Sequence, residues 1–403
     1  MGFDASILAL NLLTGIAIAR ALGPDGRGEI AAILILAQMA GWLFSLGSTQ
    51  AISYRLSQHP EDGGKLLASW AALSAVLALL AIALVELVLP TLFSAQAAET
   101  IDLARIYAAT IALMLAQAVL NGMLLGDQDF GTYNLARFAG PALIATTYIV
   151  LWIGGDLSVE AALAVNAAAV AASCLIAAIR SLRRHRLDWP SAGLLRNTLW
   201  YGVRAHGGSV AGLVNYRIDL LIVPAFLGAA SIGLYSVATN VSSIIGTLTG
   251  TIAVLVLPLA ARSEQQSART VIRTLHVVLL IGIAIALPLW VLAEIALELV
   301  YGADFGAAAP ALRILLPGEV LDAAAMVLWS GLLAANRPFL SSVAAAPAAI
   351  LTLVGLLLFL DQGGIEAAAI VSTCAYTVVF AISLLLYRHV AKLRWRDFIY
   401  PPA

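Results

Sequence analysis

Ionisable side chains within long apolar stretches are the residues of this sequence best placed to do chemistry. A charge inside a membrane span costs about 2.5–3.5 kcal/mol on insertion scales, so it usually faces a cavity or a partner. The side chains that stand out are Arg20, Arg137, Arg204, Arg217, Asp219, Glu319 and Asp322. The sequence has no HExxH motif, no GxSxG motif and no Asp/Glu/His cluster with metal-ligand spacing. We therefore expect no catalytic site, no metal and no cofactor.

The arginines are suited to binding an anion. A guanidinium is planar, stays charged and holds phosphate oxygens in a bidentate manner. Arg204 and Arg217 are thirteen residues apart, about 3.6 helical turns, so they project from similar sides of one helix. We predict that Arg217, together with Arg20, binds an anionic group of a substrate. The alternative is that Arg217 pairs with Asp219 or Glu319 and joins neighbouring helices.

The other candidates also have two interpretations each. Arg137 and Arg204 are weaker substrate-binding candidates, because near a helix end they can extend to the membrane surface instead. Glu319 and Asp322 are three residues apart and share a helix face. Together with Asp219 they are candidates for coupling to a proton or cation, or for pairing with an arginine.

The composition defines the class of protein. Of the 403 residues, 62% are hydrophobic and 11% are charged, and the mean hydropathy is +0.96. Soluble domains have about 45–50% apolar and about 25% charged residues. The net charge of −1 gives no basic surface for a nucleic acid. The sequence has two cysteines, Cys174 and Cys374, which are too few for a disulfide framework. The sequence therefore predicts an integral membrane protein and excludes a soluble enzyme.

The apolar stretches predict about twelve transmembrane helices, since a span needs about 20 apolar residues. The expected spans are 3–21, 29–54, 65–93, 102–125, 132–154, 158–181, 199–227, 231–261, 270–301, 310–334, 338–360 and 364–387. Turn-forming residues predict loops between them, for example at 23–26 and 361–364.

The distribution of basic residues predicts the orientation. With both termini in the cytoplasm, seventeen of the 22 Arg and Lys residues lie on the cytoplasmic side, as the positive-inside rule requires. The chain starts Met1-Gly2-Phe3-Asp4 without a basic segment, so we expect no cleaved signal peptide.

The two halves of the sequence repeat at an offset of 205 to 209 residues. The matching pairs include Gly28 with Gly233, Phe130 with Phe339 and Pro141 with Pro347. Six helices per repeat give both halves the same orientation, so we predict two six-helix lobes related by a parallel pseudo-two-fold repeat. The predicted divisions are an N-terminal lobe at 1–182, a basic connector at 183–198, a C-terminal lobe at 199–388 and a basic tail at 389–403.

Three stretches of sequence carry a family resemblance. The first is IARALGPDGRGE at 18–29. The second combines YRID at 216–219 with LG at 227–228 and IGLYSVA at 232–238. The third is YGADF at 301–305 followed by ALRIL at 311–315. In this order they resemble the Wzx-type polysaccharide flippases of the multidrug/oligosaccharidyl-lipid/polysaccharide exporter superfamily.

The resemblance implies a V-shaped, MATE-like fold that works by alternating access. It implies a polyprenyl-diphosphate-linked oligosaccharide as substrate, moved across the bacterial inner membrane for surface polysaccharide assembly. It assigns the diphosphate or acidic sugars to Arg20 and Arg217, with Arg137 and Arg204 as weaker candidates. The expected partners are this lipid-linked substrate, the bilayer and polysaccharide polymerase machinery, with no nucleic acid. A cation-coupled multidrug antiporter or a lipid II flippase of the same superfamily stays open as an alternative.

Overall fold

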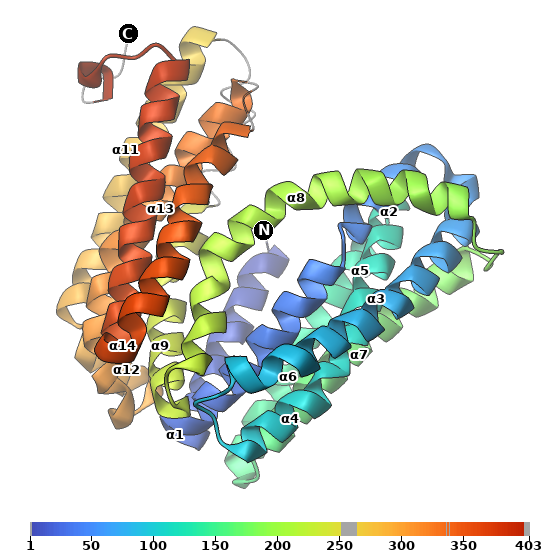
Figure 1. Cartoon of the computed structure of the whole chain (residues 1–403), viewed down its shortest axis with the longest axis horizontal. Coiled ribbons are helices and arrows are strands. Elements are labelled where there is room, and N and C mark those ends of the chain that lie inside the picture. The colour runs from blue at the N-terminus through green and yellow to red at the C-terminus, as the bar shows by residue number, and fades with distance from the viewer. Residues whose placement is uncertain (1, 251–263, 336, 338, 399–403) are drawn as a thin grey trace. The chain divides into compact units, whose positions relative to one another are not determined.

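The residues that the computed structural model describes form helices joined by short connections, with no strand among them. These are residues 2–250, 264–335, 337 and 339–398, with side chains described except at 2–5, 207–217 and 264–267. The elements, with η for 3-10 helices, are α1 (Gly2–Phe44), α2 (Ser48–Gln58), η1 (Pro60–Asp62), α3 (Gly63–Leu92), α4 (Ala98–Ala108), α5 (Thr110–Gly126), α6 (Phe130–Gly154), α7 (Val159–Arg184), α8 (Ala192–Ile222), η2 (Val223–Ala225), α9 (Ala229–Ser242), α11 (Glu264–Val291), α12 (Ala293–Tyr301), η3 (Ala303–Ala308), α13 (Ala309–Ala334), α14 (Phe339–Val390) and η4 (Trp395–Phe398) (Figure 1).

Long apolar helices account for the high hydropathy of the sequence. In the described part of the chain, eight helical stretches are long and apolar enough to cross a membrane. Helices α3, α6, α7 and α13 each fall within a few residues of one predicted span. Helix α14 extends over two predicted spans in 52 residues. The count of about twelve transmembrane helices stays a prediction.

The breaks predicted at 23–26 and 361–364 are sharp kinks between helical segments and not open loops. Helix α1 is kinked at Gly23, whose φ of 65° and ψ of −169° are not helical. Helix α14 is kinked at Gly364, whose φ of 55° and ψ of −143° are not helical. Glycine adopts positive φ without a steric penalty, so one residue redirects each helix. Pro24 follows the first bend at a position where a missing N–H costs little.

Other predicted spans are divided inside. The span predicted at 29–54 is interrupted between α1 and α2, where Leu46 and Gly47 both have positive φ. The span predicted at 270–301 is interrupted at Leu292, between α11 and α12. Helix α8 begins at Ala192, so part of the predicted connector is helical. Apolar composition alone does not locate these short interruptions.

The chain forms two compact units. Unit 1 comprises Met1–Val210 with Gly228–Gly233, and unit 2 comprises Ala211–Leu227 with Leu234–Ala403. The main core of unit 1 surrounds the fully buried Trp70 of α3, whose indole N–H donates to Thr198 Oγ1 of α8 at 3.1 Å. In unit 2, α13 packs against α11 and α14 around the buried Tyr387. The predicted lobe boundaries stay a prediction.

A glycine pair brings the start of α9 against α1 inside unit 1. A Cβ atom on Gly28 would lie 1.8 Å from the carbonyl oxygen of Ala229, and one on Gly233 would lie 1.9 Å from that of Pro24. No other residue type fits where two backbones approach this closely. Gly28 and Gly233 are also one of the pairs matched by the predicted repeat, and each lies against the backbone beside the other.

Charged side chains tie the end of α7 and the connector to the short turn between α5 and α6. The Asp127 carboxylate bonds His185 Nε2 at 2.9 Å and lies 3.2 Å from Arg184 Nε. Arg180 Nε donates to Asp129 Oδ2 at 2.6 Å. This hydrogen bond, with a second from the backbone N–H of Thr132, holds the pKa of the Asp129 carboxyl below its usual range. The connector is therefore anchored by charge-assisted hydrogen bonds.

Candidate functional site

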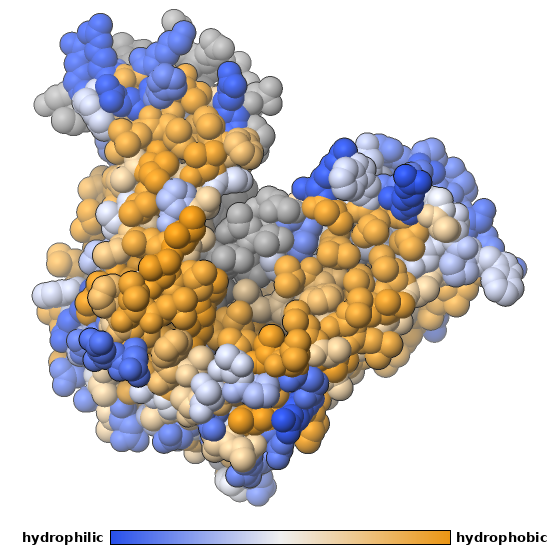
Figure 2. All heavy atoms as spheres, viewed as in Figure 1, coloured by the Kyte–Doolittle hydropathy of each residue, from blue (hydrophilic) through white to orange (hydrophobic). Residues whose placement is uncertain are grey.

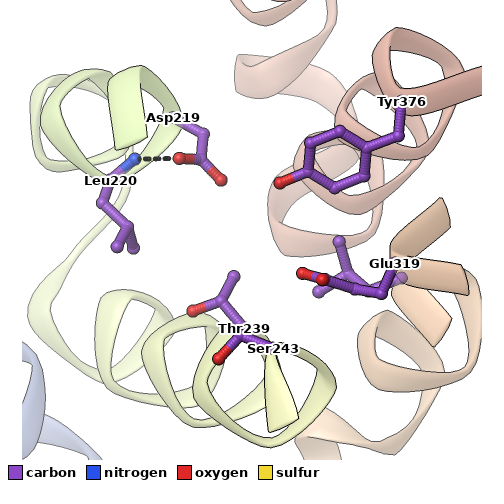
Figure 3. Close-up of a pocket in the computed structure, with 7 residues that line it drawn as sticks. Asp219, Leu220, Thr239, Ser243, Glu319 and Tyr376 are labelled. Carbon is purple, nitrogen blue, oxygen red and sulfur yellow. Dashed lines mark hydrogen bonds between the residues drawn. The ribbon is translucent and has the colours of Figure 1, made fainter. Parts of the chain in front are cut away.

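A small polar pocket lies inside unit 2. It is lined by Asp219, Leu220, Thr239, Ser243, Leu315, Glu319 and Tyr376 (Figure 3). The residues come from the end of α8, from α9 and the turn residue that follows it, from α13 and from the second part of α14. Two carboxylates and three hydroxyl groups in one apolar unit make it the strongest candidate site among the described residues of this unit.

Asp219 is held by several donors at the end of α8. Its Oδ1 accepts the N–H of Leu220 at 2.8 Å, and its Oδ2 accepts the hydroxyl of Tyr235 at 2.6 Å. Ser372 of α14 also donates to Oδ2, at 3.5 Å. Asp219 is 6% exposed, and donors of this kind offset part of the cost of burying a carboxylate. The network joins α8, α9 and α14.

Glu319 lies across the pocket on α13. It is 4% exposed, and Ser242 of α9 donates to its Oε1 at 3.4 Å. The absence of a side chain at Gly246 leaves room for Oε2, since a Cβ atom there would lie 3.4 Å away. Figure 3 shows the hydroxyl of Tyr376 directed toward the space between the two carboxylates. The structure thus brings Asp219 and Glu319 to one pocket.

Asp322 does not line this pocket. It lies three residues beyond Glu319 on α13 and is equally buried. Within the described residues no group of three or more His, Cys, Asp or Glu is arranged to hold a metal ion. The pocket offers carboxylate and hydroxyl oxygens, which suit a proton, a small hard cation or a hydrogen-bond donor.

The predicted arginines are placed separately. Arg20 is exposed on α1, three residues before the bend at Gly23. Arg137 of α6 is exposed, and its guanidinium lies 5.5 Å from the Tyr133 ring centre. Arg204 of α8 is exposed and lies 4.6 Å from the Trp200 ring centre. These three belong to unit 1, whereas Asp219, Glu319 and Asp322 belong to unit 2. The side chain of Arg217 lies outside the described residues.

Sequence reasoning missed the hydroxyl partners of the acidic residues. Tyr235, Ser372 and Ser242 were not candidates, although Tyr235 lies in the stretch that carries the family resemblance. A tyrosine within an apolar helix needs a partner for its hydroxyl group, and that signal points to Tyr235. The identity of its partner depends on helix packing, which the sequence pattern does not give.

The fold is similar to that of two solved membrane proteins. The chain matches a multidrug resistance MATE family transporter of the MOP superfamily, in an inward-facing conformation, with a TM-score of 0.79 and 16% identity over 99% of this chain and 96% of that one. It matches the lipid II flippase MurJ, in an inward closed conformation, with a TM-score of 0.82 and 14% identity over 98% and 89%. The predicted all-α, MATE-like membrane fold is confirmed.

The chain belongs to the polysaccharide biosynthesis protein family, whose model matches residues 17–310. It is 24% identical over 208 residues to the probable low-salt glycan biosynthesis flippase Agl15 of Haloferax volcanii, covering 50% of this chain and 43% of that protein. It is 26% identical over 318 residues to the succinoglycan biosynthesis transport protein ExoT of Rhizobium meliloti, covering 76% and 62%. The match thus spans less than two thirds of either relative. The resemblance recognised in the sequence is confirmed.

Proposed function

We propose that this protein is a flippase that moves a lipid-linked oligosaccharide across its membrane for polysaccharide assembly. One observation carries the proposal: a chain of the polysaccharide biosynthesis family has the fold of MurJ over 98% of its length. The names of Agl15 and ExoT support the same activity. The substrate we propose is an oligosaccharide on a polyprenyl diphosphate, flipped by alternating access without enzymatic chemistry.

We assign the anionic part of the substrate to the arginines. Arg20 and Arg217 are the primary candidates, and Arg137 and Arg204 are secondary ones. The exposure of Arg20, Arg137 and Arg204 supports this assignment, because a guanidinium must be accessible to hold a phosphate. The aromatic rings beside Arg137 and Arg204 orient their guanidinium groups.

The buried carboxylates of unit 2 have a different proposed role. Asp219 and Glu319 line one pocket and Asp322 lies one turn away on α13. We propose that they couple transport to a proton or cation, with pairing to an arginine as the alternative.

A second candidate function is a cation-coupled multidrug antiporter. The carboxylates of this pocket favour it, and so does the match of the fold to a MATE family transporter over 99% of this chain. A lipid II flippase is the third candidate, because of the likeness to MurJ.

The proposal includes a location and an orientation. The protein is a multi-pass membrane protein, and we place it in the bacterial inner membrane with both termini in the cytoplasm, as the distribution of basic residues predicts. In this arrangement the substrate is loaded at the cytoplasmic leaflet and delivered to the polysaccharide polymerase machinery outside. We keep the predicted lobes at 1–182 and 199–388, with the connector at 183–198 and the tail at 389–403, as working boundaries.

The proposed function is tested by complementation of a deletion strain. The strain carries wild type, Arg20→Ala, Arg20→Lys, Arg217→Ala or the control Arg105→Ala, whose arginine pairs with Asp102 and Glu86 in the wild type. Polyprenyl-diphosphate-linked glycans are extracted and quantified. We expect accumulation in the deletion strain, clearance by wild type and the control, and accumulation with either alanine variant at Arg20 or Arg217. Arg20→Lys is expected to restore part of the activity, since lysine keeps the charge but not the bidentate geometry.

The alternatives give different results. The absence of accumulation in the deletion strain, with unchanged surface glycan, would refute the glycan flippase. Loss of drug efflux with Glu319→Gln would then favour the antiporter. Accumulation of lipid II instead of the oligosaccharide carrier would favour the third candidate.

A further inference from the structure

The first half of α8, residues 192–206, has one buried face and one exposed face. The buried face carries Thr198, Gly202 and His206 at intervals of four residues. Thr198 accepts a hydrogen bond from Trp70, and the His206 ring lies 4.4 Å from the ring of Trp42. A Cβ atom on Gly202 would lie 2.7 Å from a backbone carbonyl oxygen of the turn after α1. These contacts fix which side of the helix faces outward.

The outward side and the adjoining connector expose large apolar and aromatic residues. Trp189 is 87% exposed, Trp200 is 60% exposed and Leu187 is 63% exposed. Tyr201 stacks on Tyr54 of α2 with ring centres 4.4 Å apart and the planes 7° apart. Trp and Tyr are enriched at the membrane–water interface, where the ring meets lipid and its polar atom meets water. This side of unit 1 has the composition of an interfacial surface.

The same surface carries arginines whose charge the neighbouring carboxylates do not balance. Arg183, Arg186 and Arg196 are exposed, and no ion pair joins them to a carboxylate within the described residues. The nearby carboxylates have other partners. Asp127 pairs with Arg184 and His185, Asp129 with Arg180, and Asp188 lies 4.0 Å from Lys65 Nζ. The surface therefore has an excess of positive charge.

We propose that this connector surface, formed by Arg183, Arg186, Leu187, Trp189, Arg196, Trp200 and Tyr201, binds acidic phospholipid headgroups of the bilayer. Arginine forms charge-assisted hydrogen bonds with phosphate, and each basic residue near an anionic leaflet strengthens binding about fivefold. Figure 2 shows hydrophilic residues beside an apolar band at the end of unit 1 where α2 and the start of α8 lie in Figure 1. In the proposed arrangement the arginines meet the lipid headgroups and the aromatic rings meet the apolar region beside them.

The experiment uses tryptophan quenching by brominated lipids. The full chain is reconstituted in bilayers of phosphatidylcholine that contain equal fractions of either acyl-brominated phosphatidylglycerol or acyl-brominated phosphatidylcholine. The chain has 8 tryptophans, so a Trp189→Phe/Trp200→Phe variant supplies the background that is subtracted. The test variant carries Arg183→Gln, Arg186→Gln and Arg196→Gln. The matched control carries Lys392→Gln, Arg394→Gln and Arg396→Gln, an equal charge change on the C-terminal tail.

We expect phosphatidylglycerol to quench Trp189 and Trp200 more strongly than phosphatidylcholine in wild type and in the tail control. The preference should fall about fivefold or more in the connector variant. In wild type, the preference for phosphatidylglycerol should also weaken as salt is added, because salt screens exposed charges. This part of the test needs no variant. Equal quenching by the two lipids, a preference that persists in the connector variant, or no quenching by either lipid would overturn the proposal.

Discussion

The glycine crossing in unit 1 allows a sharp test of how closely α1 and the start of α9 pack. We consider Gly28→Ala and Gly233→Ala, with Gly228→Ala as the matched control. The methyl group at position 28 would lie 1.8 Å from a carbonyl oxygen, whereas ordinary contact begins at 3.4 Å. At position 228 nothing lies within 4 Å of the added atom, and φ there is not positive. The three changes are chemically identical and differ only in their surroundings.

The expected magnitudes follow from these distances. The obstructing atoms at positions 28 and 233 belong to the backbone, so no side chain can rotate away and the helices must separate. We expect each variant to lose about 3 kcal/mol, the upper end of typical overpacking costs. Gly228→Ala should be neutral or gain up to about 1 kcal/mol, because alanine restricts the unfolded chain.

A double variant adds a test of reciprocity. Gly28 and Gly233 face each other across one crossing, so the separation forced by the first methyl group makes room for the second. The loss in the double variant should therefore be smaller than the sum of the single losses by about 0.5–3 kcal/mol. Thermal unfolding, followed by tryptophan fluorescence at one scan rate in lipid nanodiscs, ranks the variants. A Gly28→Ala variant as stable as Gly228→Ala, or strictly additive losses, would refute the reasoning.

Three further predictions concern single contacts. Tyr235→Phe removes the hydroxyl donor of Asp219 and should cost about 1.5–3 kcal/mol, measured by the same unfolding assay. Asp129→Asn should destabilise the protein at neutral pH, because a carboxyl whose folded pKa is lowered stabilises the fold above its unfolded pKa. The difference from wild type should shrink as the pH falls below about 4, with Arg180→Gln as the partner variant. Gly63→Ala puts a methyl group 2.1 Å from a connector imidazole nitrogen and should speed proteolysis of the connector.

Each of these predictions has a result that contradicts it. Equal stability of Tyr235→Phe and wild type would mean that the hydroxyl contributes nothing to the network around Asp219. A difference between Asp129→Asn and wild type that persists unchanged at low pH would exclude the ionised carboxylate as its cause. Unchanged proteolysis of Gly63→Ala, with Gly193→Ala as the control at an open position, would mean that the connector adapts without loosening.

Much of the fold follows from composition and periodicity. In the hydrocarbon core of a membrane the backbone N–H and C=O groups must bond to each other, and a helix satisfies all of them within one segment. Helices α3, α6 and α7 lie close to their predicted limits for this reason. The breaks at Gly23 and Gly364 were predicted from their turn-forming residues. Whether such a break becomes a sharp kink or an open loop depends on whether tertiary packing holds the flanking residues in helix.

The candidate site was predictable only in part. Asp219 and Glu319 stand out in the sequence because charge within an apolar stretch is rare. Their placement in one pocket depends on the packing of the end of α8 near α13, which brings together residues a hundred positions apart in sequence. The hydroxyl of Tyr235 at 2.6 Å from Asp219 follows from the same packing. The periodicity of a sequence predicts which face of a helix is buried, but not which other helix packs against that face.

The membership of Gly228–Gly233 in unit 1 has a consequence for biosynthesis. The partner of Gly28 emerges from the ribosome about two hundred residues after Gly28 itself, so unit 1 stays incomplete until more than half of the chain has been translated. Until then the surface of α1 around Gly28 lacks its native cover. A division of the gene in the connector would place this closing segment of unit 1 on the second fragment, so unit 1 could be completed only when the two fragments associate.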